Sequence, residues 1–328
     1  MSKSSKPKAG SRAFWPRKRA KRIYPRLNAV PEVSGEVKPL NFVAYKAGMA
    51  RIVHEGNRKD APTFGRNIAR AVTVLDCPPL KVCGAKLYGK KNDEKATLGM
   101  VFAEKLDKSL SRKMNIPGKY DFKKKLSQLE KLLPEADDVR LVVSTQPSKS
   151  GVGKKTPELV EIALSGDKDS KWNYAKENLG KELKVETIFE EGEYVDTSSV
   201  TKGKGMEGPV GRFGVIVRGR KNQGKRRHIG NIGSVTPGRV LPGKIAMAGQ
   251  HGFQTRTEFN KRIFRIGSDG FSPDGGIVNY GSVPGHYLLL QGSVGGPKKR
   301  LIMLRKGMRK TGEKLPVEIK HVAKESQQ

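Results

Sequence analysis

Three glycines, Gly203, Gly205 and Gly208, follow the G-x-G-x-x-G spacing that lets a backbone approach the pyrophosphate of a dinucleotide. That chemistry requires the glycine loop to follow a buried strand and to open a helix, whose N-terminus then faces the phosphates. A proline and two further glycines follow within six residues, and both residue types are poor helix formers. We therefore expect no helix after Gly208 and no dinucleotide cofactor.

No other group of residues predicts catalysis. Residues 151–156 (GVGKKT) lack the spacing and the Lys-Ser/Thr pair of a phosphate-binding loop. The five histidines are scattered, with no pair at the spacing of metal ligands. Cys77 and Cys83, the only cysteines, form neither a zinc motif nor a disulfide framework, and we expect them to be small buried residues of a strand region. The sequence predicts no enzyme, no cofactor and no metal site.

The basic residues predict a polyanionic partner instead. The 328 residues hold 65 Lys and Arg against 32 Asp and Glu, a net charge of +33. Residues 1–30 carry +10, residues 200–262 carry +12 and residues 296–310 carry +7. Acidic residues normally interleave a solvated charged face, and their scarcity in these segments favours phosphate binding. No apolar run approaches about 18 residues and no lipid-anchor segment accompanies the charge, so nucleic acid is favoured over a membrane.

The residue types within the basic segments suit RNA. Arg and Lys contact phosphates, and aromatic rings or guanidinium planes stack on unpaired bases. The N-terminal segment supplies Phe14, Trp15 and Tyr24 among its cations. Trp15 could stack on a base or could anchor the segment on the protein itself, and the sequence does not decide between them. Of 38 glycines, 23 lie between Thr201 and Lys310, where they let the backbone follow a sugar-phosphate surface closely.

Hydrophobic patterning predicts a mainly β protein with an α/β insertion. Phe122, Leu126, Leu129 and Leu133 share one face of a helix over 119–133, which Pro134 ends, and a second helix is expected over 168–180. A break at Pro78-Pro79 divides the apolar stretch at 71–88. Strands are expected at 40–54, 71–88, 139–145, 158–164, 185–201, 214–219, 261–267, 276–283, 286–294 and 299–305. Many short strands separated by turn residues favour a barrel or a sandwich.

The same patterns predict a division of the chain. The basic N-terminal arm is 1–38, the β core is 39–89 with 184–310, the inserted α/β region is 90–183, and the C-terminal tail is 311–328. Residues 219–260 hold few apolar residues and many Gly and Arg, so we expect a long loop that leaves the core and is packed by a partner.

A family resemblance adds to this. Residues 189–212 read FEEGEYVDTSSVTKGKGMEGPVGR and closely resemble the signature of the large-subunit ribosomal protein L-three family. Residues 229–240 (IGNIGSVTPGRV) and 247–263 (MAGQHGFQTRTEFNKRI) resemble the central loop of that family. Residues 11–20 (SRAFWPRKRA) and 44–55 (AYKAGMARIVHE) resemble its archaeal and eukaryotic branch.

The resemblance implies a six-stranded, translation-factor-like β-barrel with a long extended basic loop and an N-terminal arm. It implies a structural constituent of the large ribosomal subunit, in the cytoplasm, that binds the 3′ part of the large-subunit rRNA early in assembly. Its partners would be that rRNA and neighbouring ribosomal proteins. The central loop, a finger at about 218–261, would reach toward the peptidyl transferase centre. Many archaeal and eukaryotic relatives carry a tryptophan at the position of Val235, and valine offers no plane for stacking.

Charge and resemblance together select the expected rRNA-binding residues. They are Trp15, Arg17, Lys18, Arg19, Lys21, Arg22, Lys202, Lys204, Arg212, Arg218, Arg220, Lys221, Lys225, Arg226, Arg227, His228, Arg239, Lys244, Gln250, His251, Arg256, Lys298, Lys299 and Arg300, with the finger tip at Gly233, Ser234, Val235, Thr236 and Pro237. The alternative is a free-standing regulator that binds RNA or DNA with the same segments. An arm and a long loop without their own core argue against it, because both need a large partner to become ordered.

Overall fold

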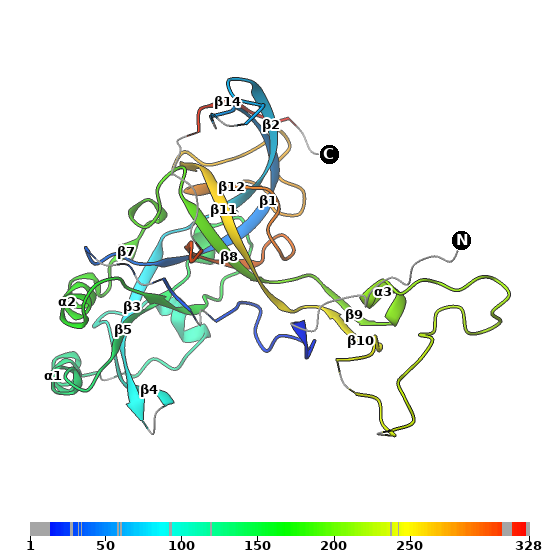
Figure 1. Ribbon diagram of the computed structural model, residues 1–328. Helices are drawn as coiled ribbons and strands as arrows, with labels where there is room; N and C mark the ends of the chain where they lie inside the picture. The colour runs from blue at the N-terminus through cyan, green and yellow to red at the C-terminus, as the bar shows by residue number, and fades with distance from the viewer. Residues whose placement is uncertain are drawn as a thin grey trace. The chain divides into compact units, whose positions relative to one another are not determined.

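The protein is mainly β, with two short α-helices beside one of its sheets (Figure 1). The computed structural model describes residues 14–26, 29–31, 33, 35–57, 59, 61–91, 94–118, 120–236, 238–241, 243–309 and 317–325. The chain divides into two compact units, one formed by Met1–Ile23 with Val200–Arg256 and the other by Tyr24–Ser199 with Thr257–Gln328.

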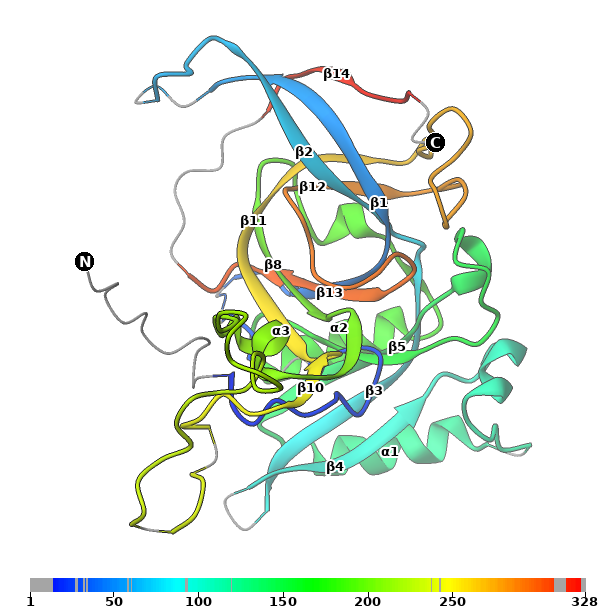
Figure 2. The same cartoon turned by 90° about the vertical axis from the view of Figure 1, so that its right-hand side faces the viewer.

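The largest sheet has the strand order β13-β8-β11-β12-β2-β1-β14, and β13 also pairs with β1 (Figure 2). Its strands are β1 (Asn41–Glu55), β2 (Asn67–Asp76), β8 (Tyr194–Val200), β11 (Thr255–Gly267), β12 (Tyr287–Gln291), β13 (Leu301–Lys306) and β14 (Ile319–Val322). Adjacent strands run antiparallel, as in the pairing of Tyr45 with Asp76 and of Phe42 with Leu304. The first half of β1 is almost wholly buried. Asn41–Tyr45 pair with β13, and the pairing with β2 begins at Tyr45.

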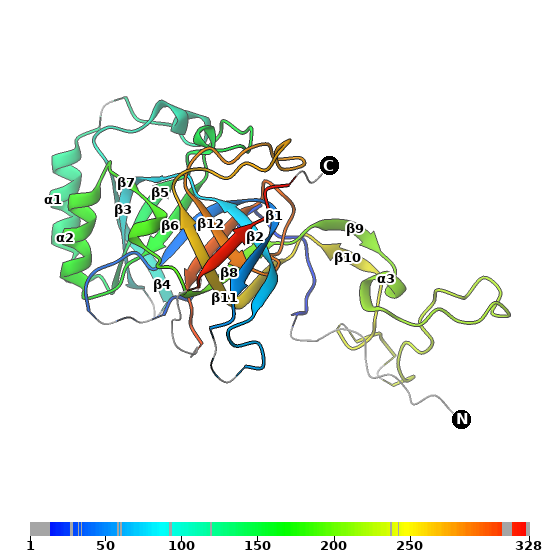
Figure 3. The ribbon, with the colours of Figure 1, turned by 90° about the horizontal axis from the view of Figure 1, so that it is seen from above.

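A second antiparallel sheet, with the order β4-β3-β5-β6, carries the helices (Figure 3). Its strands are β3 (Leu80–Lys91), β4 (Glu94–Phe102), β5 (Asp138–Ser144) and β6 (Leu159–Ala163), with the short β7 (Glu182–Leu183) paired to β3. The helices are α1 (Phe122–Leu132) and α2 (Lys168–Asn178), and short 3-10 turns occur at Lys108–Arg112, Pro147–Lys149 and Val185–Thr187. The apolar face predicted for α1 is confirmed, because Leu129 is buried and Leu126 packs against the core.

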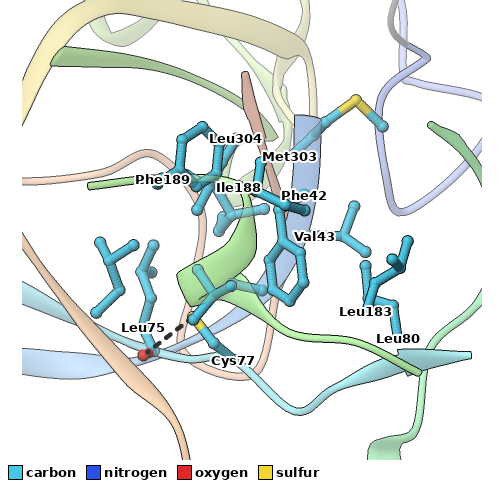
Figure 4. Packing of buried hydrophobic residues seen from close by; sticks show 14 of the residues in the cluster. Phe42, Val43, Leu75, Cys77, Leu80, Leu183, Ile188, Phe189, Met303 and Leu304 are labelled. Carbon is cyan, nitrogen blue, oxygen red and sulfur yellow. Dashed lines mark hydrogen bonds between the residues drawn. The ribbon is translucent and has the colours of Figure 1, made fainter. Parts of the chain in front are cut away.

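Strands from both sheets share one apolar core (Figure 4). Phe42, Leu75 and Leu80 are fully buried there, and Cys77 lies between β2 and β3. Both cysteines are free and buried, which confirms the structural interpretation of the pair, and burial raises the pKa of the Cys77 thiol well above its ordinary value. The predicted break at Pro78-Pro79 is confirmed by the end of β2 at Asp76.

A buried ion pair joins strands of the largest sheet. Arg305 donates from Nε and Nη2 to Oδ2 of Asp196 at 3.2 and 3.1 Å, and both side chains are buried. The other carboxylate oxygen of Asp196 accepts the backbone N–H of Asn260, which adopts a left-handed conformation with φ of 56°. Arg305 also donates to the carbonyl of Ala29. These contacts satisfy both charges, as burial of an ion pair requires.

Four expectations from the sequence are wrong in detail. Residues 214–219 form no strand, because no neighbouring strand pairs with them and Ile216 is exposed. Residues 276–283 form turns with isolated bridges, since Gly276 and Asn279 both have positive φ. Within 185–201 only β8 is a strand. A short helix, α3 (Pro209–Phe213), does follow Gly208, because proline at the first helical position loses no hydrogen bond.

In the described part of the chain, no helix is long and apolar enough to cross a membrane.

Candidate nucleic-acid interface

A two-stranded stem carries the basic loop. β9 (Gly203–Glu207) pairs antiparallel with β10 (Gly249–Gly252), with Glu207 opposite Gly249 and Met206 opposite Gln250 (Figure 1). Gly252 has φ of +70°, and a Cβ there would lie 2.0 Å from the carbonyl oxygen of Lys202. The backbones therefore approach so closely at this end of the stem that only glycine fits. The glycines that resemble a cofactor loop thus build a hairpin stem.

Arg212 lies where the loop leaves the stem and joins the two sides of the stem by hydrogen bonds. Its side chain is 7% exposed. Nε donates to the carbonyl oxygen of Gln250 at 3.0 Å and Nη1 donates to that of Met247 at 2.8 Å. Burial, with a smaller contribution from the charge of Arg17, lowers the pKa of the Arg212 guanidinium below its ordinary value. Arg212 therefore holds the two ends of the loop together with donors that face the protein's own backbone.

The described part of the N-terminal arm is held on the same unit by aromatic contacts. The Arg17 guanidinium carbon lies 4.3 Å from the centre of the Phe213 ring, and that of Arg256 lies 4.5 Å from the Phe14 ring. Arg17 also lies 3.5 Å, through Nη1, from the carbonyl oxygen of Arg212. Each contact places a cation over the negative face of a ring.

Trp15 packs on the end of the basic loop. Carbon atoms of its indole ring lie 3.0 Å from the position that a Cβ on Gly243 would occupy. Gly243 has φ of +72°, so glycine is favoured there for backbone conformation as well as for space. The anchoring role considered for Trp15 is thus present in the fold, and its side chain remains 40% exposed.

The loop itself, residues 214–248, contains turns but no helix or strand among its described residues. The backbone N–H of Arg218 donates to the carbonyl of Arg226 at 3.0 Å, which folds one turn back on itself. At the expected finger tip, the Asn231 side chain accepts the Gly233 N–H at 2.7 Å, and Val235 is 92% exposed. Pro237 lies outside the described residues. No Asp or Glu occurs between Glu207 and Glu258, so the loop carries positive charge alone.

Most of the predicted rRNA-binding residues are exposed. The exposed ones are Trp15, Lys18, Arg19, Lys21, Arg22, Lys202, Lys204, Arg220, Lys221, Lys225, Arg226, Arg227, His228, Arg239, Lys244 and Lys299. Arg17, Arg218, Gln250, His251, Arg256, Lys298 and Arg300 are partly exposed. Arg212 alone in this set is buried. All of these residues except Lys298, Lys299 and Arg300 belong to the unit Met1–Ile23 with Val200–Arg256, which therefore presents many accessible cations and few acids.

Several predicted contacts have partners within the protein. The imidazole of His251 pairs through Nδ1 with the carboxylate of Glu207, one of the few acids near the loop. Gln250 donates from Nε2 to the carbonyl of Gly252 at 3.0 Å. Lys298 donates to the carbonyl of Val278 at 2.6 Å. These contacts position side chains, and the sequence alone could not identify them because each partner is distant or is backbone.

The sequence did not predict two aromatic rings that contact arginine side chains. Phe213 supports both Arg17 and Arg212, at 4.3 and 5.1 Å from its ring centre, yet nothing in its sequence context marks it as a ring for cations. Arg309 lies 4.0 Å from the ring centre of Phe259 in the other unit, and neither residue was predicted. Among the described residues, no group of His, Cys, Asp or Glu could hold a metal ion.

The fold and this surface define a class of protein, mainly β, with a basic loop that contains no Asp or Glu and begins and ends at a two-stranded stem. Proteins of this class are suited to binding RNA phosphates.

A family model described as ribosomal protein L3 matches residues 1–328. The large ribosomal subunit protein uL3 of Methanocaldococcus jannaschii is 43% identical over 311 residues, which cover 93% of this chain and 92% of the relative. The uL3 proteins of Nanoarchaeum equitans (44% over 304 residues, covering 92% and 91%) and Methanosphaera stadtmanae (40% over 337 residues, covering 100% and 99%) are similar.

This chain belongs to the ribosomal protein L3 family. The membership confirms the resemblance identified in the sequence, including its archaeal side. As a member it is a structural, non-enzymatic protein of the large ribosomal subunit, located in the ribosome in the cytoplasm.

Proposed function

We propose that this protein binds the 3′ part of the large-subunit rRNA and supports early assembly of the subunit. The loop 214–248 and the N-terminal arm extend into rRNA toward the peptidyl transferase centre. The observation that carries this proposal is the loop without carboxylates, held at its base by Arg212 and lined with exposed cations. Guanidinium groups and glycine backbone suit close contact with phosphates, which fix position and orientation on RNA.

We infer that the rest of the fold is the scaffold that holds the loop and the N-terminal arm. We infer that β1, β2, β12, β11, β8 and β13 form a closed, translation-factor-like barrel, since β13 pairs with both β8 and β1. The proposed division keeps the arm at 1–38, the core at 39–89 and 184–310, and the insertion at 90–183, with the finger at 218–261 and the tail at 311–328. Within the finger range, β10 and the start of β11 are regular structure, so the irregular part is shorter.

Sedimentation tests the proposal. Tagged protein expressed in cells should travel with large subunits through a sucrose gradient and should leave them only at high salt, because phosphate contacts release counterions. A protein that sediments free at moderate salt would instead support the free-standing regulator. Incorporation into late but not early precursors would contradict the assembly role alone.

A further inference from the structure

A short loop joins β1 to β2 at the end of their hairpin, in the unit Tyr24–Ser199 with Thr257–Gln328 (Figure 2). The two strands pair as far as Glu55 opposite Asn67, so the loop begins directly at the end of the paired strands. We call residues 56–66 the hairpin tip, of which 56, 57, 59 and 61–66 are described. The tip belongs to none of the segments proposed above to bind rRNA.

The ring of Phe64 is exposed to solvent at the hairpin tip. Its side chain is 53% exposed, and within the described part of the chain no aromatic ring or cation contacts it. A single exposed apolar side chain is common on protein surfaces and by itself indicates no ligand. The fixed backbone of Phe64 and its cationic neighbours distinguish it from such a side chain.

Two consecutive turns fix the backbone on both sides of this ring. The N–H of Phe64 donates to the carbonyl of Ala61 at 3.0 Å, and the N–H of Arg66 donates to that of Thr63 at 3.2 Å. Phe64 and Arg66 are two residues apart, so their α-carbons lie within about 7.6 Å, since consecutive α-carbons are ~3.8 Å apart. One nucleotide can therefore place its base on the ring and its phosphate on the guanidinium.

Gly56 closes the base of the hairpin tip. Its N–H donates to the carbonyl of Arg66 at 3.0 Å, and its own carbonyl accepts the N–H of Gly65 at 2.9 Å. A Cβ on Gly56 would lie 2.1 Å from the carbonyl oxygen of Thr63, so the backbone approaches here as closely as only glycine allows. A segment held in this way loses little conformational entropy when a ligand binds, which favours a preformed contact.

The charge around the ring is positive. Residues 56–71 hold four Arg and Lys against one Asp, a net charge of +3. Lys59 and Arg66 are exposed, and among the described residues neither forms an ion pair. The nearest acid on β1, Glu55, pairs instead with Lys320 at 2.7 Å. The cations beside Phe64 are thus available to an anionic partner.

We propose that the hairpin tip binds one unpaired nucleotide of RNA, whose base stacks on Phe64 and whose phosphate contacts Arg66. An aromatic ring stacks with any unpaired base, and a guanidinium binds phosphate oxygens with two donors. The net positive charge favours RNA over an apolar pocket of a neighbouring protein as the occupant. The proposal rests on the proposed binding of rRNA and adds a contact outside the basic loop and the N-terminal arm.

Photochemical capture within large subunits identifies the occupant. Tagged full-length protein carries a genetically encoded diazirine amino acid in place of Phe64, because a diazirine captures RNA and protein alike. Irradiation of purified large subunits should link the tip to rRNA. Capture of a ribosomal protein, or of nothing, overturns the tip proposal and leaves the proposed function standing. If the unmodified protein sediments free of large subunits, both are overturned.

Affinity of the full-length protein for a large-subunit rRNA transcript tests the two side-chain roles. Phe64→Ser should weaken binding by about fivefold or more, whereas Phe64→Trp keeps a stacking plane and should bind as the unmodified protein does. Arg66→Gln should make the slope of log affinity against log salt shallower by about 0.7–0.9, the effect of one phosphate contact. Arg112→Gln, which removes an exposed arginine near the second sheet, should keep the slope.

The same measurements can overturn each role. Equal affinities of Phe64→Ser and Phe64→Trp exclude stacking, and equal slopes of Arg66→Gln and Arg112→Gln exclude the phosphate contact. Because Phe64 is exposed, Phe64→Ser should keep the thermal unfolding midpoint of the unmodified protein, so that a loss of affinity reports the lost ring.

Discussion

The guanidinium of Arg212 donates to the carbonyl oxygen of Met247 at 2.8 Å, across the two ends of a 35-residue loop. Arg212, which the charge pattern predicts to contact RNA, therefore donates hydrogen bonds to backbone carbonyl oxygens of the protein itself. We expect the positions of the exposed loop cations to depend on this contact. Loss of rRNA affinity on changing Arg212 should accordingly arise from loosening of the stem.

Arg212→Met should reduce the local stability of the stem by about 3–6 kcal/mol, because it removes two hydrogen bonds from a charged donor and each contributes about 1.5–3 kcal/mol. Hydrogen exchange at the amides of β9 and β10 measures this. Arg220→Met removes an equal charge from an exposed site and should leave that exchange unchanged. Equal exchange in the two variants would show that Arg212 does not hold the stem.

Gly252→Ala should disrupt the stem more than Gly205→Ala does. Both glycines have positive φ, at +70° and +69°, but only at Gly252 would a Cβ meet backbone, 2.0 Å from the Lys202 carbonyl oxygen. Backbone strain alone costs of order 1 kcal/mol, and the clash adds to it at Gly252. Proteolysis within the loop should be faster in Gly252→Ala, and similar cleavage rates in both variants would exclude the predicted clash.

Asp196→Ala should lower the free energy of unfolding by about 3–5 kcal/mol, because it leaves the buried charge of Arg305 without its carboxylate. The exposed pair of Lys38 and Glu36 provides the control, and Glu36→Gln should change stability by less than about 1 kcal/mol. Urea unfolding followed by circular dichroism compares the two. A loss below 1 kcal/mol for Asp196→Ala would show that the buried pair contributes little.

Ionisation of Asp76 should lower the free energy of unfolding as pH rises from about 4 to 6. Burial raises the pKa of Asp76 to about 6, although Tyr280 Oη donates to it at 2.7 Å and the Gly151 N–H at 3.2 Å. The folded state then binds a proton that the unfolded state has released, so stability falls across this range by about 2–3 kcal/mol and levels off above it. Asp76→Asn should remove this component. Urea unfolding at pH 4 and 7 measures it, and an identical pH dependence of the variant would refute it.

Local patterns predicted much of the core, because their physical cause is local. The apolar spacing of Phe122, Leu126 and Leu129 suffices for α1, since burying that face needs only some sheet beside it. The strand predicted at 214–219 failed because β-branched residues also need a partner strand, and Ile216 has none among the described residues. α3 was missed because proline and glycine were considered as helix breakers without regard to their positions at its two ends.

The basic character of the site was visible in the sequence, and its internal contacts were not. Charge and glycine content mark the segment that contains Arg226 and Arg227 without any knowledge of the fold. The contact of Trp15 with Gly243 joins residues 228 positions apart, and no local pattern encodes it. A cavity lined by His54, Phe264 and Gln291 also forms only when β11, β12, β2 and β1 lie side by side in the sheet.

Salt dependence of binding to a 3′ fragment of the large-subunit rRNA tests the central claim most directly. The double variant Arg226→Ala with Arg227→Ala removes two exposed cations of the loop, and Lys123→Ala with Lys124→Ala removes two exposed cations of α1. If each loop arginine neutralises one phosphate, the slope of log affinity against log salt should become shallower by about 1.4–1.8 in the loop variant. The α1 variant should keep the slope of the unmodified protein. Equal slopes for the loop variant and the unmodified protein would contradict the account.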